Sequence, residues 1–222
     1  MALFPIVLGS IFLLNCLFSI KKIAVSSDEK NIKLIGLESL KNLNLIFFDP
    51  KTAEIDIVQK NPSIKTVNIT KKYPDKIIID IEKDQPIAVL RADQGFFFLS
   101  AEGKIIFKKK DNDTRLPLIN YYQNFYYYQY QAGEKIDYDE VLASVDFLKR
   151  TDSLGLKVDT VDISGVHMVA FNLGDKKILF SLEKDRRVQD FQLETIIKQF
   201  KIEGKEFFSL DLRFDKPVIK LK

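Results

Sequence analysis

The chain has 222 residues, 46% hydrophobic and 29% charged, which excludes a collagenous, low-complexity or wholly disordered protein. Its formal net charge of +3 falls well short of the basic excess of a dedicated nucleic-acid binder. Cys16 and His167 are the only cysteine and histidine. An intrachain disulfide and zinc sites with four cysteine and histidine ligands are therefore excluded, and a serine or cysteine triad would have only one imidazole available.

The first predicted element is a transmembrane helix. Residues 2–20 carry no charged side chain and are followed by Lys21 and Lys22. At about 1.5 Å per residue the run nearly spans a hydrocarbon core of about 30 Å, and it exceeds the apolar region of a cleavable signal peptide. We therefore expect an uncleaved anchor over residues 1–22. The bulky Asn15 argues against lipid attachment at Cys16. Charge alone would place the following domain in the cytoplasm, because both lysines follow the helix.

A β-α-α-β-β unit is predicted next. Alternation predicts a strand over residues 31–35, and apolar spacing predicts a short helix over 37–43. Asp49 is a capping residue for a second helix that must end near Asn61 and Pro62. Residues 63–72 and 76–83 are rich in β-branched side chains and flank a turn, which predicts a hairpin. The result is one sheet with two helices on one face.

Short strands dominate the rest of the chain. Strand patterns fall at residues 87–91, 95–99, 104–107, 116–119, 158–163, 168–172, 177–182, 207–214 and 216–222, and amphipathic helix patterns at 137–150 and 187–200. Seven aromatic residues stand between Tyr121 and Tyr130. Because no lysine or arginine is interleaved, we interpret them as core packing or a loop rather than a stacking platform for bases or sugars.

The sequence offers no catalytic cluster. His167 lies in an alternating stretch and is interpreted as a satisfied or exposed strand histidine. Asp80 and Glu82 lie on one strand face between lysines, which is typical of a surface pair and not of an acid–base dyad. We therefore expect a protein that is not an enzyme, with no catalytic, cofactor-binding or metal-binding residues, no nucleic-acid partner and no small-molecule substrate.

Two stretches resemble a known family. From Asn61-Pro62 through Tyr73-Pro74 to Glu82 and Pro86-Ile87-Ala88, the sequence resembles the signature of the FtsQ-type POTRA domain. Leu210-Asp211-Leu212-Arg213-Phe214 resembles the strand that closes FtsQ/DivIB cell division proteins. The resemblance implies an α+β fold with three parts. These are a single transmembrane helix at 1–22, a POTRA domain at 23–91, and a mainly antiparallel β domain with two helices at 92–222 that ends in an edge strand.

The resemblance also implies a function. Such a protein is a non-enzymatic, bitopic scaffold of the bacterial divisome that recruits FtsB- and FtsL-like partners by β-strand addition and helps regulate septal peptidoglycan synthesis. Its large C-terminal part lies outside the cytoplasmic (inner) membrane at the division septum, contrary to the charge rule. Arg213 and Phe214 take the positions that contact FtsB in the family, and Val218 and Ile219 extend that surface. For Leu210 and Leu212 we expect a core-facing position instead.

Two other classes of function are weighed against this one. A POTRA-containing export or outer-membrane assembly factor would need tandem POTRA units or a transmembrane barrel, and the sequence shows neither pattern. A membrane-anchored hydrolase of wall polymers would need a carboxylate pair facing a cleft.

Overall fold

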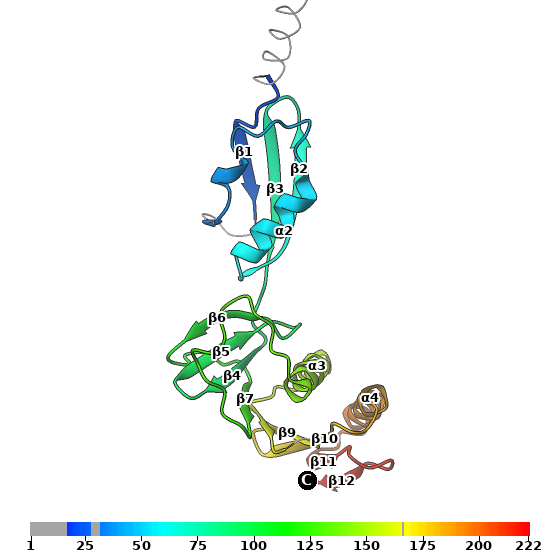
Figure 1. Ribbon diagram of the computed structural model, residues 1–222. Helices are drawn as coiled ribbons and strands as arrows, with labels where there is room; N and C mark the ends of the chain where they lie inside the picture. The colour runs from blue at the N-terminus through cyan, green and yellow to red at the C-terminus, as the bar shows by residue number, and fades with distance from the viewer. Residues whose placement is uncertain (1–16, 28–31, 166) are drawn as a thin grey trace, which may run out of the picture. The chain divides into compact units, whose positions relative to one another are not determined.

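The structure is a computed structural model that describes residues 17–27, 32–165 and 167–222. The chain divides into two compact units, Met1–Asp84 and Gln85–Lys222, whose elements are labelled in Figure 1. Most of the predicted anchor at 1–22, including Cys16, lies outside the described residues. Within the described ranges, no helix is both long and apolar enough to cross a bilayer.

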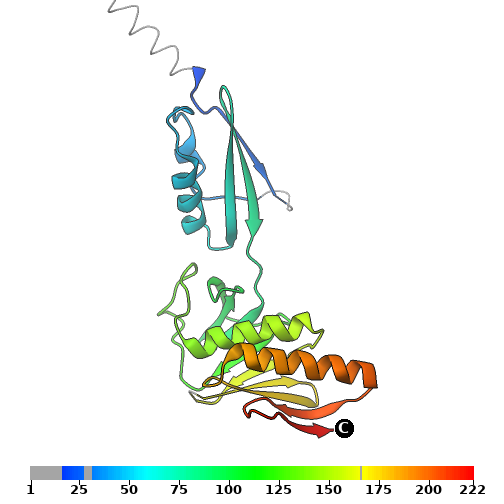
Figure 2. The same cartoon turned by 90° about the vertical axis from the view of Figure 1, so that its right-hand side faces the viewer.

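The first unit is a small sheet with a helix on one face (Figures 1 and 2). Its sheet has the order β1-β3-β2, with β1 parallel to β3 and β2 antiparallel to it. The helix packs through Ala53 and Ile57 onto the same core as Ile77 and Ile79 of β3. The elements are β1 (Lys22–Ser26), the 3-10 helix η1 (Glu38–Leu40), α2 (Pro50–Lys60), β2 (Ile64–Lys72) and β3 (Lys76–Lys83).

The second helix and the hairpin of this unit are confirmed, but the first two predicted elements are wrong. No strand forms at residues 32–35, because the Asn61 side chain binds that backbone. The Asn61 Oδ1 accepts from the Ile35 N–H at 2.9 Å and its Nδ2 donates to the Ile35 carbonyl at 2.9 Å. The edge strand comes instead from Lys22–Ser26. The helix expected at 37–43 shrinks to a single 3-10 turn, since Asn42 has a φ of 63° and its N–H donates to the Ile20 carbonyl.

The second unit is one mixed sheet with two helices. The sheet order is β12-β11-β10-β9-β8-β7-β4-β5-β6. The pairs β4–β7, β7–β8 and β10–β11 are parallel, and the remaining pairs are antiparallel. The predicted α+β class with an antiparallel-rich sheet is therefore confirmed. The elements are β4 (Ala88–Ala92), β5 (Gly95–Leu99), β6 (Ile105–Lys109), β7 (Leu118–Tyr121), α3 (Asp139–Ser153), β8 (Thr160–Ile163), β9 (Met168–Leu173), β10 (Lys176–Ser181), α4 (Arg186–Glu203), β11 (Phe207–Asp211) and β12 (Val218–Leu221). Since β4 belongs to this sheet, the units divide after Asp84 and not at the predicted boundary after residue 91.

Helices α3 and α4 lie side by side on one face of this sheet, as Figure 2 shows. Phe147 of α3 is buried and stacks on Phe180 of β10 with ring centroids 4.1 Å apart, while Phe171 of β9 meets Phe180 edge-on at 5.0 Å. Asp185 caps α4 by accepting the Arg187 N–H at 2.7 Å. The aromatic core therefore holds the helices against the centre of the sheet.

A short strand joins the two halves of the sheet. β7 pairs with β4 at Val89↔Leu118 and Leu90↔Ile119, and on its other side with β8 along four residues. This arrangement places β6 at one edge of the sheet and β12 at the other.

A candidate partner-binding edge at strands β11 and β12

The C-terminal edge of the second sheet presents unpaired backbone groups. β12 pairs with β11 in antiparallel register, Leu210 opposite Ile219, and no strand borders its outer side in the described part of the chain. The Lys222 N–H donates to the Glu206 carbonyl at 3.0 Å. Because backbone groups alternate in direction along a strand, the N–H and C=O groups of Ile219 and Leu221 point away from β11. Two residues thus offer two donors and two acceptors to an added strand.

Apolar side chains border this edge. Val218 is 58% exposed, Phe214 53% and Leu221 52%, and Phe208 of β11 is 38% exposed. Ile219 is half-buried and packs against the core instead. An added strand would therefore meet an apolar rim as well as free backbone groups.

Arg213 and Phe214 lie in the turn between β11 and β12, and not in a strand as predicted. β11 ends at Asp211, because the Asp211 carboxylate accepts the Arg213 N–H at 3.1 Å and so supports a turn. Leu212 is fully buried and donates its N–H to the Leu179 carbonyl at 2.9 Å. Leu210 is buried as well, so the core-facing position expected for both leucines is confirmed.

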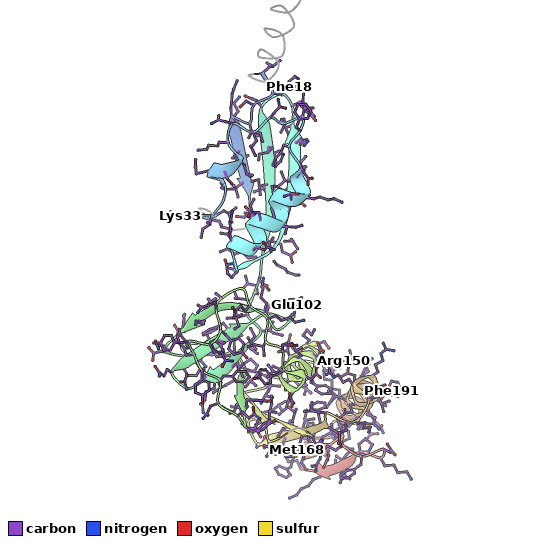
Figure 3. The ribbon with its side chains drawn as sticks, viewed as in Figure 1. Phe18, Lys33, Glu102, Arg150, Met168 and Phe191 are labelled. Carbon is purple, nitrogen blue, oxygen red and sulfur yellow. The ribbon has the colours of Figure 1, made fainter. Side chains whose placement is uncertain are left out.

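The Arg213 guanidinium is bound within its own chain. Its Nε donates to Asp211 Oδ1 at 2.9 Å and its Nη2 to Asp211 Oδ2 at 2.7 Å, while Nη1 lies 3.2 Å from the sulfur of Met168, labelled in Figure 3. The Arg213 hydrogen bond holds the pKa of Asp211 below its ordinary value and raises the pKa of Arg213. The guanidinium also lies 5.6 Å from the Phe214 ring centroid, so it makes a cation–π contact with that exposed ring. A contact between Arg213 and a partner stays a prediction.

A second cation fixes the same turn from the side of α4. The Lys184 ammonium donates to the carbonyls of Leu212 at 3.1 Å and Phe214 at 2.5 Å, and to Gln192 Oε1 at 2.9 Å. The Gln192 amide in turn donates to the Asp215 carbonyl at 2.8 Å. Sequence reasoning missed Lys184 and Gln192, because their partners are backbone carbonyls more than twenty residues away and neither side chain stands in a motif.

The other residues considered from the sequence form no reactive site. His167 is exposed in the turn before β9, and its Nδ1 lies 3.0 Å from the Glu183 carboxylate. Glu82 accepts from Lys65 at 2.8 Å and from Thr66 at 3.1 Å, and these hydrogen bonds lower its pKa. A lowered pKa is the opposite of what a general acid requires. No group of three potential metal-binding side chains occurs among the residues that the structure describes.

The tyrosine-rich stretch is partly core and partly surface. Phe125 is buried, and Tyr127 stacks on the buried Phe97 at 5.8 Å. Tyr128 is 68% exposed. The stretch itself contains no lysine, but lysines of β6 and of the turn after it contact its tyrosines. The Lys108 Nζ donates to the Tyr127 carbonyl at 2.8 Å. Lys110 lies 4.2 Å from the Tyr127 ring centroid. The packing interpretation is thus confirmed for Phe125 and Tyr127.

Comparison with known proteins links both units to cell division proteins. The family model described as POTRA domain, FtsQ-type, matches residues 18–83. The chain is 29% identical to the cell division protein DivIB of Clostridium botulinum strain Hall in an alignment 184 residues long, which covers 79% of this chain and 70% of that protein. It is 26% identical to DivIB of Clostridium tetani in an alignment 195 residues long, which covers 82% of this chain and 72% of the relative. It is also 25% identical to the cell division protein FtsQ of Syntrophotalea carbinolica in an alignment 114 residues long, which covers 49% of this chain and 38% of that protein.

Proposed function

The chain is an FtsQ/DivIB-type protein, and on that basis we propose that it is a non-enzymatic scaffold of the bacterial divisome. In this proposal it recruits FtsB- and FtsL-like proteins and thereby helps regulate septal peptidoglycan synthesis. The names of its relatives support a role in cell division.

The observation that carries the proposal is the free edge of β12 with its apolar rim. An extended segment of an FtsB-like partner adds there as a further strand, and its backbone satisfies the outward groups of Ile219 and Leu221. Four such hydrogen bonds at about 0.5–1.5 kcal/mol each contribute about 2–6 kcal/mol. Contacts with Phe214 and Val218 supply the rest of the affinity and the preference for an apolar partner side chain.

We also propose that the protein is a single-pass protein of the cytoplasmic membrane at the division septum, with both folded units outside the cytoplasm. The uncharged run at residues 2–20 supports a membrane anchor. The orientation is inferred from the family and opposes the two lysines that follow the run.

A pair of substitutions at Leu221 tests strand addition. Leu221→Pro removes a backbone N–H that points away from β11, so it leaves the β11–β12 pairing intact but deletes a donor for the partner. Leu221→Ala keeps that donor and removes only the side chain. Calorimetric titration of the full chain in detergent with the extracytoplasmic segment of the FtsB-like protein from the same organism should show weaker binding for Leu221→Pro than for Leu221→Ala.

Phe214→Ala should also weaken binding, since Phe214 is the more exposed of the two phenylalanines on the rim. Wild-type affinity in both Leu221→Pro and Phe214→Ala would overturn the assignment of this edge. Absence of binding by the unsubstituted chain would overturn FtsB recruitment itself.

A further inference from the structure

Large exposed apolar side chains gather at one end of the first unit. Phe47 is 85% exposed, Tyr73 61%, Leu17 52% and Ile46 48%, and Phe18 is half-buried beside them. We call these five residues the N-terminal patch. A folded unit of this size seldom leaves so many large apolar side chains in water without a partner surface.

Backbone contacts hold the segments of the N-terminal patch side by side. The Leu45 N–H donates to the Phe18 carbonyl at 2.7 Å, and the Phe18 ring meets the Tyr73 ring edge-on at 6.1 Å. The Lys71 ammonium lies 3.4 Å from the Ile46 carbonyl and joins the start of the β2–β3 turn to the segment before α2. Figure 3 labels Phe18 at this end of the unit. Residues distant in sequence therefore form one surface.

Exposed lysines surround the N-terminal patch. Lys21 and Lys72 are exposed and make no ion pair in the part of the chain that the structure describes, and Lys22 has only a 3.7 Å contact with Asp75. An apolar and aromatic centre with free cations beside it complements a bilayer surface. Aromatic rings favour the interfacial region, and lysines favour anionic headgroups.

The position of the N-terminal patch in the chain favours lipid over a protein partner. Leu17 and Phe18 are part of the patch and are also among the last residues of the uncharged run at 2–20. If that run is the membrane anchor, the chain leaves the bilayer through this surface. We propose that the N-terminal patch lies on the membrane, with Phe47 and Ile46 in the interfacial region and Lys21 and Lys72 against anionic phospholipid headgroups. The inference rests on the proposed membrane anchor but not on partner recruitment.

The chain contains no tryptophan, so the fluorescence of a single introduced tryptophan reports the depth of that side chain in the bilayer. Phe47→Trp places it in the N-terminal patch at a position that already carries an exposed aromatic ring. The matched control is Ile35→Trp, because Ile35 is 65% exposed in the same unit but its backbone bonds to Asn61, at the far end of α2. The 11 residues of α2 separate the two ends by about 16 Å at 1.5 Å per residue.

Both full-length variants are reconstituted into vesicles of phosphatidylethanolamine and phosphatidylglycerol, with and without brominated acyl chains. We expect bromine to quench the indole at position 47 and shift its emission to the blue, while position 35 keeps the emission of a water-exposed indole. Replacing phosphatidylglycerol by phosphatidylcholine, or combining Phe47→Trp with Lys21→Gln and Lys72→Gln, should reduce the quenching.

Equal quenching at the two positions in chains that float with the vesicles would overturn the inference while leaving the anchor intact. Chains that do not float with the vesicles would overturn the anchor and the inference together. Binding of the FtsB-like segment is measured separately, so partner recruitment can fail or succeed independently of either result.

Discussion

Replacing Gln189 by leucine should destabilise the second unit. The Gln189 side chain is fully buried on α4. Its Oε1 accepts the Ser181 N–H at 2.8 Å, and its Nε2 donates to the Ser181 carbonyl at 2.7 Å and to the Lys184 carbonyl at 3.1 Å. The amide thus completes the hydrogen bonding at the end of β10 and fastens α4 to the sheet.

The expected loss follows from the groups that the substitution leaves unpaired. Gln189→Leu leaves the buried N–H and C=O of Ser181 without hydrogen-bond partners, and each unpaired group costs about 1–3 kcal/mol of stability. Burial of the added methyl groups recovers about 1–2 kcal/mol. The midpoints of these ranges, about 4 and about 1.5 kcal/mol, differ by about 2.5 kcal/mol. We therefore expect the free energy of unfolding of the second unit to fall by about 2.5 kcal/mol, above the error of such a measurement.

Urea unfolding of the full chain in detergent, followed by tyrosine fluorescence, measures this effect. Seven of the eight tyrosines belong to the second unit and only Tyr73 to the first, so the signal reports mainly on the second unit. The control is Gln199→Leu, the same change at an exposed position of α4, where the Gln199 side-chain amide donates to Glu203 Oε1 at 2.7 Å. This control should cost less than about 0.5 kcal/mol. If Gln189→Leu unfolds at the same urea concentration as Gln199→Leu, the argument from buried hydrogen bonds is refuted.

Two further predictions concern stability. Gly95→Ala should destabilise the second unit by about 2 kcal/mol or more, because Gly95 has a φ of 153° and a Cβ there would lie 2.5 Å from the Tyr127 ring. The control is Gly174→Ala, which should cost only about 1 kcal/mol, because Gly174 has a φ of 61° but open space around it. Equal losses of stability in urea unfolding would contradict this reasoning. Asp211→Asn should remove a stabilisation of only about 1 kcal/mol, because Arg213 is partly exposed and solvent screens the pair. Since the pKa of Asp211 is lowered from 3.8, this stabilisation is present above about pH 4 and is lost as the pH falls through the lowered pKa. The difference in unfolding free energy between variant and wild type should therefore shrink from about pH 6 to about pH 3, and a difference that grows toward acid would be inconsistent with the ion pair.

Local patterns predicted the elements whose partners are close in sequence. The β2–β3 hairpin and the helix capped by Asp49 follow from alternation, a turn and a capping side chain, all within about twenty residues. β1 escaped detection because it pairs in parallel with β3, starting at Lys22↔Lys76, more than fifty residues away. The parallel pairing of β7 with β4 and β8 was also invisible, since register between distant strands leaves no periodic signal in either one.

The partner-binding role of Arg213, Phe214, Val218 and Ile219, which the family resemblance implies, stays a prediction. Val218 and Ile219 lie in β12, whereas Arg213 and Phe214 lie in the turn before it. A strand running through residue 214 was nevertheless expected, because alternation continues past Asp211. The turn depends on the Asp211 carboxylate and on Lys184, and the carbonyls that Lys184 binds become its neighbours only after α4 has docked on the sheet.

The weak pairing of β7 with β4 has a mechanical consequence. The second unit begins at β4, and its proposed partner binds at β12, so a pull between an anchored N-terminus and a bound partner acts across the strands and not along them. A sheet loaded in that direction opens by successive rupture of single hydrogen bonds, and the pair with the fewest bonds yields first. With only Val89↔Leu118 and Leu90↔Ile119 in register, the β4–β7 junction is that pair. We therefore expect a load applied between β4 and β12 to open the sheet first at these two residue pairs.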